Sequence, residues 1–143
     1  VDSLWPRESG VLSPASRGLP FVLRNGRRSM PIHTTAVVDS RAAIDPTAEI
    51  GPYVVIEGPV TIGAGTKVGP HAHLLGSTTI GAKCVIHAGA VIGDLPQDRA
   101  YAGGESFVSV GEETIIREYV TIHRGTKAGT HTVVGRGCML MAH

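Results

Sequence analysis

Aliphatic side chains recur at every sixth position along most of the chain. The series is unbroken over eleven units and then returns in the same phase after an interruption: Ile32, Val38, Ile44, Ile50, Ile56, Ile62, Val68, Leu74, Ile80, Ile86 and Ile92, followed by Val110, Ile116, Ile122, Ala128, Val134 and Leu140. A helix repeats every three or four residues and a half-buried strand every two, so neither explains a step of six. The pattern predicts a backbone that returns to an interior wall once in six residues.

A second series of small or slim side chains lies four residues after the aliphatic positions: Ala36, Ala42, Ala48, Val54, Val60, Thr66, Ala72, Thr78, Cys84 and Ala90, then Thr114, Val120, Thr126, Thr132 and Cys138. One large and one small inward position per unit describe a short strand followed by a sharp corner. Three such strands close a coil of about 18 residues, and coils stack about 4.8 Å apart through parallel ladders. We expect residues 30–143 to form this all-β fold, a parallel β-helix of hexapeptide repeats.

Two segments fall outside the repeat. Residues 94–108 separate Ile92 from Val110 and are polar and rich in turn formers, so they predict a loop that leaves the solenoid wall. Residues 1–29 carry five arginines against two acids and show no periodicity. We expect them to be a disordered basic leader, or translated upstream sequence before a start at Met30.

Composition and charge exclude several classes of function. The 143 residues carry a net charge of +1 and only 4% of them are aromatic. The basic residues are neither dense nor interleaved with aromatic ones, so nucleic acid is not an expected partner. No apolar run approaches the roughly 20 residues that span a membrane as a helix. Cys84 and Cys138 both belong to the small inward series, where we expect buried, reduced thiols.

Two motifs give the repeat a more specific meaning. The loop reads PQDRAYAGGE from Pro96, and a following coil reads IIREYVTIHRGT from Ile115. Together they resemble the acyl-carrier-protein-dependent UDP-N-acetylglucosamine O-acyltransferases, which carry P-Q-D-x-K-Y-x-G-E in the loop and R-E-x-V-T-I-H-R-G-T after it. The resemblance covers about residues 30–143. It implies a left-handed coil, a cytoplasmic homotrimer and no cofactor.

The resemblance also implies a reaction, the first step of lipid A biosynthesis. A 3-hydroxyacyl group moves from acyl carrier protein to the 3-hydroxyl of UDP-N-acetylglucosamine, and an imidazole removes the hydroxyl proton as the thioester is attacked. The family's base lies in a stretch of the form L-M-x-x-x-H-x-x-H-D, whereas this chain ends Leu-Met-Ala-His at His143. By that register the base lies beyond His143. We therefore expect a truncated solenoid, the N-terminal part of an acyltransferase, without activity alone and with no catalytic residue of its own.

The loop supplies the expected substrate contacts. Gln97 and Asp98 match family residues that line the nucleotide-sugar cleft, with the aspartate on the sugar. The next family contact is a lysine, where this chain has Ala100, and the adjacent Arg99 is the nearest replacement for that charge. We therefore expect substrate binding at Gln97, Asp98 and Arg99. Tyr101 also matches the family pattern, and packing of the loop is the alternative interpretation of it.

Two other classes of function stay open. Hexapeptide solenoids include zinc carbonic-anhydrase-like trimers, in which histidines from two subunits bind one metal ion. His71, His73 and His87 are the residues from which such a site would be drawn, but the motifs of this chain do not resemble that family. A non-catalytic scaffold is the other alternative. For a single histidine a surface position is the simpler interpretation, and only His123, inside TIHRGT, is expected to have a structural or interfacial role.

Overall fold

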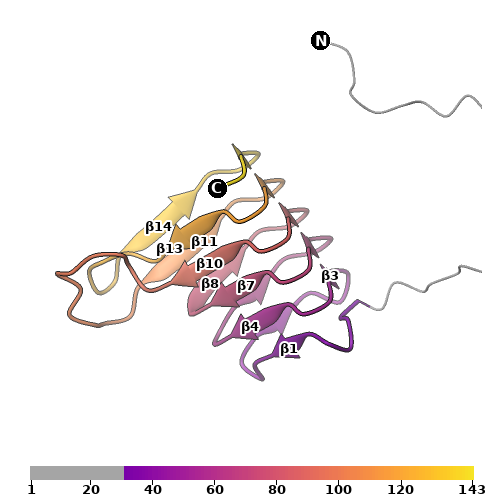
Figure 1. Ribbon diagram of the computed structural model, residues 1–143, viewed down its shortest axis with the longest axis horizontal. Coiled ribbons are helices and arrows are strands. Elements are labelled where there is room, and N and C mark those ends of the chain that lie inside the picture. The colour runs from indigo at the N-terminus through magenta and orange to yellow at the C-terminus, as the bar shows by residue number, and fades with distance from the viewer. Residues whose placement is uncertain (1–30) are drawn as a thin grey trace, which may run out of the picture.

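The computed structural model describes residues 31–143, which form fifteen short strands and no helix. The strands make three parallel sheets of five strands each, the three walls of a solenoid (Figure 1). The all-β parallel β-helix expected from the repeat is confirmed. Within the described residues, no helix is long and apolar enough to cross a membrane. The expectation for residues 1–29 lies outside the described part of the chain.

Each wall takes one strand from every coil. The first wall contains β1 (Val37–Val38), β4 (Val55–Glu57), β7 (His73–Leu75), β10 (Val91–Asp94) and β13 (Thr121–His123). The second contains β2 (Ala43–Ile44), β5 (Thr61–Ile62), β8 (Ser77–Ile80), β11 (Phe107–Val110) and β14 (His131–Val134). The third contains β3 (Glu49–Ile50), β6 (Lys67–Val68), β9 (Val85–Ile86), β12 (Ile115–Ile116) and β15 (Met139–Leu140).

The aliphatic series forms the interior. Neighbouring strands of the early coils pair eighteen residues apart, as in Ile56 with Leu74 and Ile62 with Ile80, so branched side chains stack in columns inside the walls. The largest side chains with less than 2% exposure include seven members of this series: Ile56, Ile62, Leu74, Ile80, Ile86, Ile92 and Ile116. Burying each of them contributes about 1.5–3 kcal/mol, so the columns are the main source of the stability of the fold.

The small series includes hydroxyl and thiol groups that find backbone partners. The buried Thr66 hydroxyl donates to the Gly81 carbonyl at 2.7 Å and accepts from the Cys84 amide at 3.0 Å. Thr114 repeats the second contact with the Cys138 amide at 3.2 Å. Both cysteines are free; Cys84 is buried as expected, and burial raises the pKa of its thiol. Cys138 is only half-buried, because β15 has a neighbouring strand on one side only.

Two insertions leave the stack at the corner where the first wall is followed by the second, which we call the loop corner. Ser77 of β8 pairs with Phe107 of β11, thirty residues on instead of eighteen, so twelve residues are inserted between β10 and β11. Phe107 pairs with His131 of β14, twenty-four residues on, so six more follow β13. Twelve and six are whole multiples of the repeat. The aliphatic phase therefore survives both insertions.

The second insertion corrects the sequence-based prediction at Ala128 and Thr126. The repeat places both residues on the inside, but Ala128 is exposed and residues 124–130 lie outside the strands. A small residue at the expected phase conceals an insertion that is one repeat long. The first loop is also shorter than the predicted range 94–108, because Asp94 ends β10 and Phe107 begins β11; it comprises residues 95–106.

Candidate functional site

The candidate site lies at the loop corner, where loop 95–106 and loop 124–130 lie side by side (Figure 1). The Gly129 amide donates to the Glu105 carbonyl at 2.8 Å, which joins the two loops. A Cβ added at Gly104 would lie 3.0 Å from the Ala128 Cβ, so the two loops are also in close apolar contact at these two residues. Loop 95–106, which contains the PQD motif, therefore packs against loop 124–130, whose first residues belong to the TIHRGT motif.

Both ends of loop 95–106 are bonded to the solenoid. At its start, the Arg124 amide donates to the Asp94 carbonyl at 3.0 Å, and Nδ1 of His123 lies 2.7 Å from the Leu95 carbonyl oxygen. At its end, the Ser77 hydroxyl donates to Oε1 of Glu105 at 3.0 Å. These contacts hold the loop against β8 and β13 and fix where it leaves the wall.

The three residues predicted to bind substrate occupy one exposed turn of this loop. Gln97, Asp98 and Arg99 are all exposed. Oδ1 of Asp98 accepts from the Ala100 amide at 2.8 Å, and the Asp98 carbonyl accepts from the Tyr101 amide at 3.1 Å. One carboxylate oxygen therefore closes the turn, and Oδ2 has no partner among the described residues. A turn of this kind holds the carboxylate in one orientation before any ligand binds.

The tyrosine of the motif closes the loop on itself. The Tyr101 hydroxyl donates to the Gly104 carbonyl at 3.0 Å, in agreement with the packing interpretation of this residue. Ala100 offers no charge where the family has a lysine, and Arg99 makes no ion pair within residues 31–143. Arg99 is therefore the cation that the turn can present to an anionic ligand.

A groove of about 610 Å³ runs along the loop corner beside the loop. Its floor contains Gly58, Gly76 and Gly93, whose φ angles are +87°, +60° and +93°. Glycine is suited to this left-handed region because it has no Cβ to clash with the backbone. Arg124 lies on this floor, because a Cβ at Gly76 would be 2.7 Å from its Nη1. The groove at the loop corner is thus lined by glycine backbone and by charged side chains.

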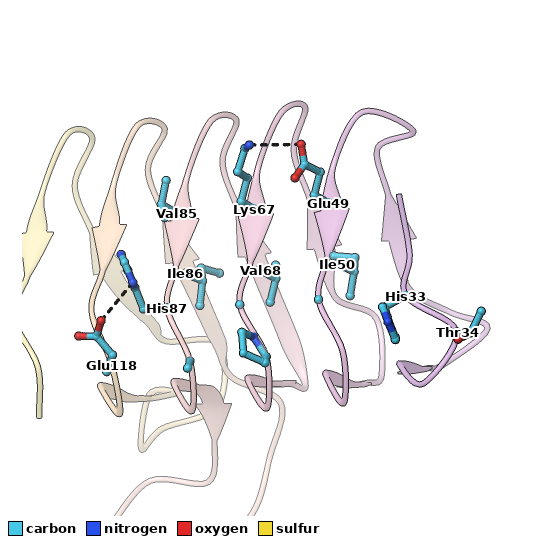
Figure 2. A pocket seen from close by; sticks show the side chains of 14 residues that line it. His33, Thr34, Glu49, Ile50, Lys67, Val68, Val85, Ile86, His87 and Glu118 are labelled. Carbon is cyan, nitrogen blue, oxygen red and sulfur yellow. Dashed lines mark ion pairs between the residues drawn. The ribbon is translucent and has the colours of Figure 1, made fainter. Parts of the chain in front are cut away.

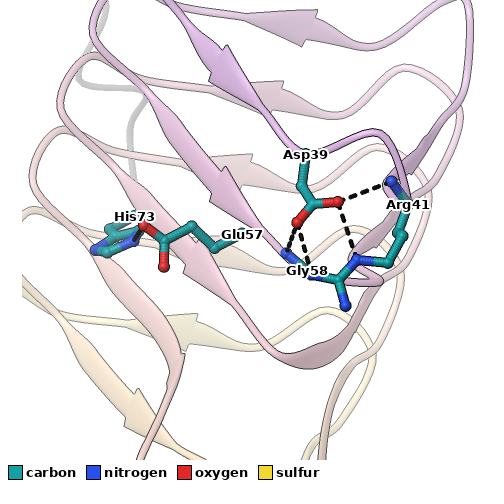
Figure 3. A network of polar contacts seen from close by, with 5 residues as sticks. All are labelled: Asp39, Arg41, Glu57, Gly58 and His73. Atoms are coloured by element: carbon teal, nitrogen blue, oxygen red, sulfur yellow. Dashed lines mark hydrogen bonds and ion pairs between the residues drawn. The ribbon is translucent and has the colours of Figure 1, made fainter.

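The first coil closes this corner with a carboxylate. Asp39 accepts from Nη2 of Arg41 at 2.7 Å, from Nε of Arg41 at 3.0 Å and from the Gly58 amide at 3.1 Å (Figure 3). These bonds, first among them those from the Arg41 guanidinium, hold the pKa of the Asp39 carboxyl well below its usual range. In the next coils, Oε1 of Glu57 lies 3.5 Å from Nε2 of His73.

A second depression, of about 640 Å³, lies on the third wall (Figure 2). His33 marks one end, and at the other end Nδ1 of His87 lies 3.2 Å from Oε1 of Glu118. Lys67 and Glu49 pair across neighbouring strands at 3.3 Å. This depression contains no residue of either loop. We therefore associate the loop chemistry with the loop corner.

Comparisons with known proteins agree with the motifs. Residues 41–76 and 59–94 match the family model "Bacterial transferase hexapeptide (six repeats)". The chain is 48% identical over 112 residues to the acyl-[acyl-carrier-protein]–UDP-N-acetylglucosamine O-acyltransferase of Chlorobaculum parvum, and 50% identical over 115 residues to that of Aquifex aeolicus. The solved structure of LpxA from Acinetobacter baumannii superposes with a TM-score of 0.75 at 40% identity, over 79% of this chain and 44% of that one. The chain belongs to the UDP-N-acetylglucosamine O-acyltransferase family.

The family match covers most of this chain but less than half of the relatives. It spans 78% of the chain and 42% of the Chlorobaculum protein, and 80% of the chain and 44% of the Aquifex protein. The matched part of this acyltransferase-family chain includes the solenoid coils and the loop corner. The activity, substrates and partners of the whole protein are therefore treated below as proposals.

The structure does not bring together the histidines considered for zinc. His71 stacks on Tyr53 with the ring centroids 5.1 Å apart, whereas His73 faces Glu57 and His87 faces Glu118. Residues 31–143 hold no group of three or more His, Cys, Asp or Glu side chains arranged for a metal ion. Each of the three imidazoles thus contacts a different side chain, and they do not converge on a common site.

Two of the residues that attach the loop carry no signal in the sequence. Ser77 belongs to no motif, and it meets Glu105, the last residue of PQDRAYAGGE, only because β8 and β11 pair thirty residues apart. Leu95 contributes a backbone carbonyl, which leaves no signal in the amino-acid sequence. The motifs mark only His123, through TIHRGT, and Glu105, through PQDRAYAGGE, and neither motif shows what these side chains contact.

Proposed function

We propose that this chain is part of an O-acyltransferase that moves a 3-hydroxyacyl group from acyl carrier protein to the 3-hydroxyl of UDP-N-acetylglucosamine in lipid A biosynthesis. The observation that carries the proposal is the PQD turn, fixed by its own hydrogen bonds and attached to the TIHRG segment at the loop corner. Relatives with this name are 48% identical to the chain over 112 residues and 50% identical over 115 residues. The reaction takes place in the cytoplasm, and the whole protein works as a homotrimer.

The turn suits a sugar nucleotide chemically. Asp98 has one carboxylate oxygen left to accept a hydrogen bond from a sugar hydroxyl, and Gln97 offers an amide that both donates and accepts. Arg99 places a permanent positive charge beside them, suited to the diphosphate. We therefore propose that Gln97, Asp98 and Arg99 bind the nucleotide sugar.

Titration of the chain with UDP-N-acetylglucosamine tests the proposal. Asp98→Asn removes the charge from the exposed turn, and we expect it to weaken binding about tenfold, the usual size for a lost charge-assisted hydrogen bond. Asp45→Asn is the matched control, because Oδ1 of Asp45 accepts from the Thr47 amide at 2.8 Å in a similar turn of another corner. Equal affinities for wild type and Asp98→Asn, measured by isothermal titration calorimetry, would contradict the assignment.

A further inference from the structure

Among residues 31–143, the side chain of His123 has one hydrogen-bonding partner, and that partner belongs to the loop. Nδ1 lies 2.7 Å from the Leu95 carbonyl oxygen, and Nε2 is buried with no partner among the described residues. A carbonyl oxygen only accepts, so Nδ1 carries the proton of this bond. The hydrogen bond of the imidazole ring thus goes to Leu95, the first residue after β10.

The register of the first wall explains why the ring meets this residue. β10 pairs with β13 as Ile92 with Ile122 and then Asp94 with His123, so the strand bulges at Gly93. The bulge turns the chain away from the wall immediately before Leu95. His123, the last residue of β13, therefore lies at the point where loop 95–106 begins.

The middle of the loop has no bond of its own to the solenoid. The hydrogen bonds of the exposed turn run within the loop, from Ala100 and Tyr101 to Asp98 and from Tyr101 to Gly104. The bonds that reach the wall lie at the two ends of the loop, at Leu95 and at Glu105. The orientation of the PQD turn as a whole is therefore set by these attachments.

We propose that His123 is a positioning residue, whose Nδ1–H bond to Leu95 holds loop 95–106 so that the PQD turn faces the nucleotide-sugar site. The effect of His123 on substrate binding rests on the proposed function. The attachment of the loop by His123 does not depend on it. Leu95 is two residues from Gln97, so release of this carbonyl lets the turn move relative to the wall. His123 acts through the loop and touches no reacting atom.

Three substitutions separate the hydrogen bond from the bulk of the ring. In His123→Asn the side-chain amide nitrogen takes about the position of Nδ1 and restores the donor. In His123→Gln the amide extends to about the position of Nε2, and His123→Leu keeps volume without any donor. The proposal predicts that Asn behaves like wild type and that Gln and Leu behave alike.

Trypsin cleavage of the Arg99–Ala100 bond, followed by mass spectrometry on the whole chain, is the direct measurement. We expect His123→Leu and His123→Gln to be cut there about three- to tenfold faster, as for the loss of one neutral hydrogen bond. His123→Asn should stay within about twofold of wild type. Cleavage after Arg136, in an exposed turn between β14 and β15, is the internal control and should not change.

The outcomes are distinguishable. Equal cleavage after Arg99 in all four proteins overturns the proposal, as does failure of His123→Asn to restore protection. Equal acceleration after Arg99 and Arg136, with a lower melting temperature in every variant, also overturns it, because His123 would then support only the coil. If the cleavage order holds and affinity for UDP-N-acetylglucosamine follows it, both proposals gain. If the order holds but wild type does not bind the nucleotide sugar, the attachment stands and the proposed function fails.

Discussion

Gly93 shows at the residue scale how a missing side chain lets the chain leave the wall. Its φ is +93°, and a Cβ added there would overlap the Leu75 carbonyl oxygen and the Thr78 hydroxyl of the coil below. Those two atoms are themselves hydrogen-bonded at 2.6 Å, so neither can move away freely. The bulge that starts the loop therefore requires glycine for both backbone angle and space.

Gly93→Ala should cost roughly 3–5 kcal/mol of unfolding free energy, because backbone strain and overpacking add. Gly103→Ala is the matched control: its φ is also +93°, but a Cβ there meets nothing within 4 Å. It should cost only the backbone strain, about 1–2 kcal/mol. Urea unfolding of the two variants measures the difference, and equal losses would show that close packing at Gly93 does not matter.

The carboxyl groups of Asp39, Asp45 and Glu118 make the stability of the fold depend on pH in the acidic range. Hydrogen bonds lower the pKa of each, from Arg41 to Asp39, from Thr47 to Asp45 and from Arg117 to Glu118. A carboxyl with a lowered folded-state pKa contributes stability above its unfolded pKa, and that contribution is lost as the pH falls through the folded value. The melting temperature should therefore fall as the pH drops below about 4.5.

Asp39→Asn tests this acid dependence. The variant should melt below wild type near neutral pH and lose less of its melting temperature between about pH 5 and pH 3, because the largest of the three shifts is gone. Melting curves by circular dichroism in matched buffers give both profiles. Parallel profiles over that range would show that the Arg41–Asp39 pair adds nothing to the acid dependence.

At the scale of elements, the two loops are insertions into one regular coil. Gly76 alone connects β7 to β8. In the next coil the corresponding connection consists of Asp94 and loop 95–106, and in the following coil it consists of loop 124–130, which begins with Arg124. Each insertion preserves the phase of the aliphatic columns on both sides. The two loops therefore differ in length without disturbing the walls, because the strands on either side keep their own pairing.

Deletion of residues 95–106 together with Asp94→Gly should leave the solenoid folded and abolish binding of UDP-N-acetylglucosamine. The twelve residues are two repeats, so Ile92 and Val110 keep their phase, and glycine takes the place that Gly76 has one coil earlier. Circular dichroism and calorimetric titration measure the two effects.

Deletion of only residues 96–106 from the same variant is the control. This variant keeps Leu95, so two residues must make the corner that Gly76 makes alone one coil earlier, and we expect it to melt at a lower temperature than the twelve-residue deletion. Equal melting temperatures for the two deletions would contradict the view of the loop as two inserted repeats.

At the scale of the whole molecule, the solenoid is a one-dimensional stack in which each coil contacts only its neighbours. Central aliphatic residues such as Leu74 and Ile92 are fully buried, whereas Ile32 in the first coil is 38% exposed and Leu140 in β15 is half-buried. β10 has a strand on each side, β7 and β13. Loop 95–106 thus follows a strand that is paired on both sides, whereas β13, which carries His123, pairs only with β10 among the described strands.

The sequence by itself determined the walls, the interior columns and the place of the first loop, because the repeat of six is a local property that each unit carries in its own side chains. Ile56 and Leu74 needed no knowledge of distant residues to be assigned inward. The PQD and TIHRGT motifs likewise identified the family before any contact was known.

Only the tertiary structure decided which surfaces meet. The contacts of His123 with Leu95, Ser77 with Glu105 and Gly129 with Glu105 join different coils or loops, and their spacing depends on the length of the insertions between them. The displacement of Ala128 from the interior follows from the same lengths, since a six-residue insertion leaves the periodicity unchanged. A periodic pattern fixes which face a residue occupies, but the stacking of coils fixes which residues face each other.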